Sequence, residues 1–238
     1  MDRPIALVTG GSGGIGSACV SELASDHDVA VHYHTDRDGA ESAAETAKAA
    51  GAETLLLRAD FGDRPDVEAT VDRVVDHFGG LDVLVNNAAV FFRTGLLEMT
   101  PERIGTTLSV NLAGTIHCSR AALPAMLEDG GGRIVTIASR AGTRGSPTDP
   151  VYGASKGGVI AFARSIARQF TADGVFSNVV APGATATKMY AEERRPAKRE
   201  ASPIDRLVKP EEVADAVRFF AETEAISGRV LEIDGGQS

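Results

Sequence analysis

The chain of 238 residues lacks several features that other classes of protein require. It has no tryptophan, only two cysteines, and no run of eighteen apolar residues that would make a membrane-spanning helix. Cys19 and Cys118 are far apart and have no C-x-x-C partner, so we expect two small core residues without a disulfide. The five histidines show no ligand spacing, so no metal is expected.

Positive charge is also scarce. The 33 acidic residues outnumber the 24 basic ones, which gives a formal net charge of −9, and only five of the basic residues are lysine. This balance argues against nucleic acid and against an anionic membrane as partners, because both attract basic surfaces. It suggests either a GC-rich genome or adaptation to high salt. Met1–Pro4 leads straight into an apolar run, without a signal-peptide pattern, so we expect a cytoplasmic protein.

The chain does contain a regular alternation of short apolar runs and segments with helical periodicity. The absence of repeats and linkers predicts one α/β domain over residues 1–238. The alternation predicts a Rossmann-type, doubly wound parallel sheet of seven strands in the order 3-2-1-4-5-6-7, with helices on both faces. The expected strands are 5–8, 29–33, 54–57, 83–85, 134–138, 177–180 and 230–233, and the longest expected helices are 64–78, 101–127 and 151–173.

A glycine-rich segment follows the first apolar run at once. It reads Thr9-Gly10-Gly11-Ser12-Gly13-Gly14-Ile15-Gly16, and a helical pattern then continues to Ala24. Strand, glycine loop and helix together bind dinucleotides, because glycines let the backbone approach the pyrophosphate and free N–H groups at the helix N-terminus meet its charge. We therefore expect cofactor contacts at Gly10, Ser12, Gly14, Ile15 and Gly16.

A tyrosine, a lysine and a serine near the middle of the chain form a second candidate site. Tyr152 and Lys156 are four residues apart, so they share one face if 151–173 is helical. A neighbouring ammonium lowers the pKa of a tyrosine from its usual ~10 towards the pH at which a proton donor works best. Ser139 ends an apolar run, which places its hydroxyl at a strand tip. The alternative is a buried tyrosine and a surface lysine on an ordinary amphipathic helix.

Taken in order, these motifs resemble the short-chain dehydrogenase/reductase family, in its simple single-domain branch, over the whole length. The family pattern is T-G-x-x-x-G-x-G, N-N-A-G, a mid-chain Asn, a Ser, Y-x-x-x-K, P-G, and a last strand followed by glycines. Here these read Thr9 to Gly16, Asn86-Asn87-Ala88-Ala89, Asn111, Ser139, Tyr152 with Lys156, Pro182-Gly183, and Asp234-Gly235-Gly236. Ala89 departs from the family glycine by one methyl group.

The resemblance implies an NAD(P)-dependent oxidoreductase whose catalytic residues are Asn111, Ser139, Tyr152 and Lys156. Tyr152 would exchange a proton with a substrate oxygen that Ser139 holds, and Lys156 would also bind the nicotinamide ribose. Asn111 would anchor a proton-relaying water, or alternatively satisfy a helix kink. Further cofactor contacts are implied for Tyr33, His34, Asp60, Phe61, Asn87, Ala88, Tyr152, Lys156, Pro182, Gly183, Thr185 and Thr187. Asp60 has a second interpretation, as the N-cap of the helix 64–78.

The residues after the second expected strand bear on the choice of cofactor. An aspartate at that strand end binds the ribose hydroxyls of NAD and repels the 2′-phosphate of NADP. This chain has Tyr33 there, followed by His34 and Arg37, which favour a phosphate, and by Asp36, which weakens the positive field. We favour NADP(H), with NAD(H) as the alternative.

Similarity is strongest to 3-oxoacyl-acyl-carrier-protein reductases, which implies NADPH-dependent reduction of a 3-oxoacyl thioester to a secondary alcohol. The turns Glu128-Asp129 and Ala172-Asp173 oppose docking of an acidic carrier protein, because like charges slow encounter. Two alternatives remain open: a sugar or secondary-alcohol dehydrogenase, and a catalytically idle dinucleotide-sensing or scaffold protein.

The substrate pocket and the assembly are expected from the same resemblance. The segment 184–203 should cover the pocket of a small-molecule carbonyl or alcohol. Its Met189 and Tyr190, together with Phe91 and Phe92, are candidate lining residues. The family forms homotetramers through its long helices and last strand, so a homotetramer or a homodimer is expected.

Overall fold

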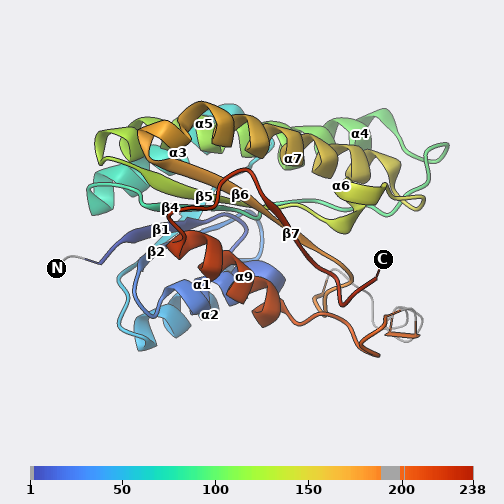
Figure 1. The fold of residues 1–238 in the computed structure, drawn as a ribbon, viewed down its shortest axis with the longest axis horizontal. Coiled ribbons are helices and arrows are strands. Elements are labelled where there is room, and N and C mark those ends of the chain that lie inside the picture. Colours follow the sequence, from blue (N-terminus) through green and yellow to red (C-terminus); the bar gives the residue numbers. More distant parts are fainter. Residues whose placement is uncertain (1–2, 189–198, 201, 238) are drawn as a thin grey trace.

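Seven parallel strands form one sheet in the computed structural model, which describes residues 3–188, 199–200 and 202–237. The strand order is β3-β2-β1-β4-β5-β6-β7, which confirms the predicted fold class (Figure 1). The strands are β1 (Ile5–Val8), β2 (Asp28–Tyr33), β3 (Thr54–Arg58), β4 (Val83–Asn86), β5 (Gly132–Ile137), β6 (Val175–Pro182) and β7 (Val230–Ile233). The first and last strands have the predicted bounds, and the others differ by one or two residues at an end.

Helices cover both faces of this sheet (Figure 1). One face carries α1 (Gly14–Leu23), α2 (Arg37–Ala49) and α9 (Pro210–Glu222). The other carries α3 (Arg64–Phe78), α5 (Thr115–Glu128) and α7 (Pro150–Phe170). Shorter helical elements are α4 (Pro101–Leu108), a π-helix (Ser109–Gly114), α6 (Arg140–Arg144) and a 3₁₀ turn (Thr171–Asp173). Within the described ranges, no helix is long and apolar enough to cross a membrane.

The central strand β1 shows why the strands are continuously apolar. Ala6, Leu7 and Val8 are fully buried, because both faces of a parallel sheet are covered by helices. Successive side chains point to opposite faces, so Ala6 and Val8 join the core beneath α1, α2 and α9, whereas Leu7 joins the core beneath α3 and α5. One apolar strand therefore contributes side chains to the hydrophobic cores on both faces of the sheet.

The long helix predicted for 101–127 is present, but its middle turn is π-helical. Thr100 caps its start, where the Thr100 hydroxyl accepts a hydrogen bond from the Arg103 N–H at 3.4 Å. The π-helix ends at Gly114, where a Cβ would lie 2.5 Å from the Phe61 carbonyl oxygen. The π-helix therefore passes close to the loop after β3 at Gly114. Asn111 lies within the π-helix.

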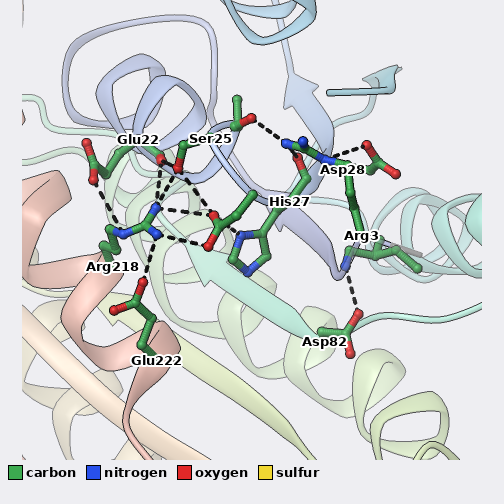
Figure 2. Close-up of polar contacts among 11 residues, drawn as sticks. Arg3, Glu22, Ser25, His27, Asp28, Asp82, Arg218 and Glu222 are labelled. Atoms are coloured by element: carbon green, nitrogen blue, oxygen red, sulfur yellow. Dashed lines mark hydrogen bonds and ion pairs between the residues drawn. The ribbon is translucent and has the colours of Figure 1, made fainter. Parts of the chain in front are cut away.

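Charged residues tie α9 to α1 at the amino ends of the central strands (Figure 2). The Arg218 guanidinium of α9 donates to the Ser25 hydroxyl at 2.7 Å and to the Asp26 carboxylate at 2.9 Å. It also forms an ion pair with Glu222, one turn further along its own helix. This cluster lies at the edge of the sheet opposite the glycine loop, so it stabilises the fold away from the candidate site.

Candidate active site

The carboxyl ends of β1, β4, β5 and β6 meet at one edge of the sheet, and the predicted motifs follow them there. The glycine loop follows β1, Asn87 follows β4, Ser139 follows β5, and Gly183 follows β6. In open α/β sheets this edge holds the ligand, at the point where the strand order reverses. The sequence therefore predicted correctly that these residues lie together.

The glycine loop has a backbone that side chains would not permit. Gly10 and Gly14 have positive φ angles of 64° and 55°, and a Cβ on Gly16 would lie 2.0 Å from the Gly10 carbonyl oxygen. The Asn87 side chain fastens the loop, because its Nδ2 donates to the carbonyl oxygens of Thr9 and Gly10, each at 2.9 Å. These two hydrogen bonds attach the glycine loop to the segment after β4.

The N-terminus of α1 lacks a side-chain cap. Gly13 is its N-cap residue and has no side chain to offer, and a Cβ there would meet no atom within 4 Å. N–H groups at such a helix start attract an anion, through unsatisfied donors and the helix dipole. The loop therefore offers open space and donors for a pyrophosphate.

His32 supports the glycine loop, and the sequence reasoning did not predict this role. Its Nδ1 accepts a hydrogen bond from the Gly10 N–H at 3.1 Å, and its Nε2 donates to the Ala59 carbonyl oxygen at 3.2 Å. Its ring lies 4.0 Å from that of Phe61. Burial lowers the pKa of His32 to about 4, so the imidazole is neutral. A lone histidine within the buried run of β2 was the available signal.

A cavity of about 440 Å³ lies beside the glycine loop. Of the predicted cofactor residues, Gly10, Ser12, Gly14, Ile15, His34, Asp60, Phe61, Asn87, Ala88 and Thr187 line it. Gly16 and Tyr33 do not, because Gly16 packs against the Gly10 backbone and Tyr33 is buried in the core beneath α2. His32, Thr35, Asp36 and Lys188 also line the cavity, without having been predicted.

Asp60 does not cap α3. Its Oδ1 accepts a hydrogen bond from the Gly62 N–H at 2.8 Å, and Asp63 occupies the N-cap position of the helix. The alternative interpretation of Asp60 as that N-cap was wrong. Asp60 lines the cavity beside the glycine loop, and its contact to a cofactor stays a prediction.

A second cavity of about 340 Å³ brings together Ser139, Tyr152 and Lys156. Four further residues that were predicted to contact the cofactor also line it, namely Pro182, Gly183, Thr185 and Thr187. The two cavities share Ile15, Asn87, Ala89 and Thr187, so they form one continuous cleft along the sheet edge.

Lys156 is buried beside Tyr152 on the helix α7. The residue is 3% exposed, and its ammonium nitrogen lies 5.8 Å from the centre of the Tyr152 ring. The ammonium donates to the Ile137 carbonyl oxygen at 2.8 Å. Burial lowers the pKa of Lys156 from 10.5 to about 8, so it is still mainly a cation at neutral pH. The alternative interpretation of Lys156 as a surface lysine on an ordinary amphipathic helix was therefore wrong.

Ser139 begins a short helix that was not predicted. It is the N-cap of α6, and its hydroxyl oxygen accepts a hydrogen bond from the Ala141 N–H at 3.1 Å. The chain then turns at Gly145, and this region adds lining residues that sequence reasoning missed, namely Arg140, Ala141, Ser146, Pro147 and Thr148. In the sequence, the turn residues Gly145-Ser146-Pro147 could have indicated this region.

Asn111 is fully buried and holds the loop after β4. Its Oδ1 accepts from the Val90 N–H at 2.8 Å, and its Nδ2 donates to the Val90 carbonyl oxygen at 3.0 Å and to the Ser155 hydroxyl at 3.2 Å. The side chain therefore satisfies a neighbouring loop and α7, and these bonds do not go to the backbone of its own helix.

The aromatic residues of that loop have different roles. The Phe91 ring lines the cavity, 4.8 Å from the Tyr152 ring. Phe92 does not line either cavity, and the Arg103 guanidinium lies over its ring, 5.4 Å from the ring centre. Met189 and Tyr190, like most of the expected covering segment 184–203, lie outside the described residues.

Comparison with known proteins identifies relatives of almost the same length. A family model described as short chain dehydrogenase matches residues 4–198. A 3-oxoacyl-[acyl-carrier-protein] reductase FabG from Staphylococcus aureus is 34% identical over 97% of this chain and 96% of its own. Carbonyl reductase family member 4 from Xenopus tropicalis is 39% identical over 98% and 97%. The crystal structure of a short-chain dehydrogenase from Burkholderia cenocepacia in complex with NADP is 37% identical, with a TM-score of 0.93 over 99% and 97% of the chains.

Proposed function

Because this chain belongs to the short-chain dehydrogenase family, and is thus an NAD(P)-dependent oxidoreductase acting on CH–OH or C=O groups, we propose that it reduces a 3-oxoacyl thioester to a secondary alcohol with NADPH. The observation that carries the proposal is the cleft itself. Ser139, Tyr152 and Lys156 lie in one of its halves, and the glycine loop lies in the other.

The residues of the cleft fit a dinucleotide. The uncapped start of α1 and the open space at Gly13 suit the pyrophosphate, and the cavity lined by His34, Asp60 and Phe61 suits the adenosine. Thr185, Thr187 and Lys156 lie on the side of the second cavity, where we place the nicotinamide ribose and amide. When bound there, the cofactor supplies the hydride for the carbonyl carbon.

The protein's own residues supply the proton and hold the substrate. We assign Tyr152 as the donor of a phenolic proton to the carbonyl oxygen, with the Ser139 hydroxyl holding that oxygen. The Lys156 cation stabilises the phenolate that remains, and its burial strengthens this effect because the local dielectric is low. We also assign Asn111 to anchor a water that relays protons, in addition to its hydrogen bonds to the loop after β4.

The name of the staphylococcal relative supports a 3-oxoacyl substrate. The acidic turn at Glu128-Asp129 and the turn ending at Asp173 argue against an acidic carrier protein as its obligatory bearer. We therefore propose a thioester that does not need the carrier. A sugar or secondary alcohol is the second candidate class, and an idle sensing protein the remote one.

NADPH is the proposed cofactor, with NADH as the alternative. His34 lines the adenosine side of the cleft, and no acidic side chain ends β2. Asp36 also lines the cleft, but its carboxylate already accepts a hydrogen bond from the Gly39 N–H at 3.0 Å. The Burkholderia relative was crystallised with NADP, which supports the same choice.

Three further proposals concern the whole molecule. Residues 1–238 form one domain, in which the segment 184–203 covers the substrate. The protein assembles as a homotetramer or homodimer. It works in the cytoplasm on a small molecule, without nucleic acid or membrane.

The first test is oxidation of NADPH with a short 3-oxoacyl thioester, compared with NADH, for the wild type and Tyr152→Phe. We expect Tyr152→Phe to lose turnover by about a thousandfold, while cofactor affinity changes less than about twofold, because only the proton donor is removed. Retained turnover in that variant contradicts the assignment of Tyr152. Equal rates with NADH contradict the choice of NADPH, and no turnover by the wild type moves the search to sugars and secondary alcohols.

A further inference from the structure

A buried carboxylate close to Tyr152 has no part in the chemistry proposed above. Asp149 is fully buried, and its backbone N–H donates to the Ser146 hydroxyl at 3.1 Å. Its Oδ1 accepts the Tyr152 N–H at 3.0 Å, which makes it the N-cap of α7. Among the described residues it forms no ion pair, so backbone N–H groups and the positive end of the α7 dipole balance its charge.

The other carboxylate oxygen reaches a different element. Asp149 Oδ2 accepts the Arg93 N–H at 3.0 Å, across 56 positions of sequence. Arg93 has a φ of 51°, a left-handed conformation that is unfavourable for a residue with a side chain and needs an external contact to hold it. One side chain therefore joins the first turn of the tyrosine helix to the loop after β4.

That loop carries the aromatic wall of the catalytic cavity. Asn111 fixes it at Val90 through two hydrogen bonds, and Asp149 fixes it at Arg93. Phe91 lies between these two anchors, with its ring 4.8 Å from that of Tyr152. The separation of Phe91 and Tyr152 thus depends on how Asp149 spans its two partners.

We propose that Asp149 is a positioning and specificity-determining residue, which holds the Phe91 ring against the Tyr152 ring and thereby limits the room in the cavity for the substituent on the reacting carbonyl. The inference rests on the proposed function, since it takes Tyr152 as the proton donor. At 4.8 Å between their centres the two rings are in contact, so they form one continuous aromatic wall. A straight chain next to the carbonyl can lie along this wall, whereas a branched one meets it.

Asp149→Ser separates the two contacts of the carboxylate. A serine still caps a helix, so α7 keeps its start, but its single short hydroxyl cannot also reach the Arg93 N–H. We expect the preference for straight over branched 3-oxoacyl thioesters, measured as the ratio of kcat/KM values, to fall by about tenfold. NADPH affinity should stay unchanged. The matched control is Asp82→Ser, which removes a carboxylate that accepts the Ile5 N–H at 2.7 Å at the opposite edge of the sheet.

A double-mutant cycle with Phe91→Ala tests whether Asp149 acts through Phe91. With the ring removed, Asp149→Ser should change the preference by less than about twofold, because the two residues share one effect. An unchanged preference in Asp149→Ser, or an equal fall with and without Phe91, overturns the proposal. A fall of the same size in Asp82→Ser overturns it as well.

A measurement without substrate keeps the proposal separate from the proposed function. In protein with selectively protonated Phe and Tyr, we expect a nuclear Overhauser effect between the rings of Phe91 and Tyr152, assigned with Phe91→Leu and Tyr152→Phe. It should weaken in Asp149→Ser and persist in Asp82→Ser. If the wild type reduces no ketone, the proposed function fails while this readout still decides the role of Asp149, and an undiminished effect in Asp149→Ser overturns it.

Discussion

Replacing Lys156 by methionine should make the cofactor-free protein more stable while it destroys activity. Lys156 is 3% exposed, and burial lowers its pKa from 10.5 to about 8. At pH 7 the lysine is charged in the folded and the unfolded chain alike. The difference of 2.5 pKa units therefore measures the cost of burying the charge, about 3 kcal/mol at 1.36 kcal/mol per unit.

Methionine fills a similar volume without this cost, but it leaves the Ile137 carbonyl oxygen without the 2.8 Å hydrogen bond from the ammonium. Subtracting about 1 kcal/mol for that bond leaves a net gain of about 2 kcal/mol in the free energy of unfolding. For a chain of this size the gain corresponds to a rise of roughly 4–8 °C in Tm.

The dependence on pH identifies the cause. Because the pKa of Lys156 is lower in the folded protein, the cost of burying its charge is absent above pH 10.5 and grows as the pH falls towards 8. The wild type therefore loses that part of its free energy of unfolding between these two pH values. The advantage of Lys156→Met should thus be full at pH 7 and shrink as the pH rises through 9 and 10. Urea unfolding at these three values measures it, with the exposed Lys48→Met as the control, expected to change stability by less than about 0.5 kcal/mol. A variant less stable than the wild type at pH 7, or an advantage independent of pH, would refute the reasoning.

Two further predictions concern residues that stabilise the fold. The pKa of His32 is about 4 in the folded protein and 6.5 ordinarily, so the stability that the neutral imidazole contributes is complete above pH 6.5 and is lost as the pH falls towards 4. In urea unfolding, the stability advantage of the wild type over His32→Leu should therefore shrink by about 2 kcal/mol between pH 7 and pH 5. His32→Leu should also weaken cofactor binding by about tenfold at pH 7, because the Gly10 N–H loses its acceptor, and an unchanged Kd would contradict this. Arg218→Leu should lower the free energy of unfolding by about 1–2 kcal/mol at low salt and by less in 1 M salt, with kcat/KM unchanged because the cluster lies at the opposite edge of the sheet; a loss of activity without a loss of stability would contradict it.

The sequence alone determined the layout of the fold and the set of candidate residues. Apolar runs between helical segments define the strands through local patterning, which is why β1 and β7 have the predicted bounds. The rule that crossovers between parallel strands are right-handed then predicted the strand order correctly. The glycine loop and the Tyr152–Lys156 spacing are equally local, because they depend on neighbours within one turn or one helix face.

Tertiary structure decided the contacts that join distant segments. The π-helical turn around Asn111, the tie between His32 and Gly10, and the span of Asp149 from Tyr152 to Arg93 each link residues tens of positions apart or depend on such links. Periodicity carries no information on which distant N–H group a buried side chain will meet, because that depends on how the helices pack onto the sheet. The same holds for the burial of Lys156, since a spacing of four residues places two side chains on one face but does not say whether that face meets water or the sheet.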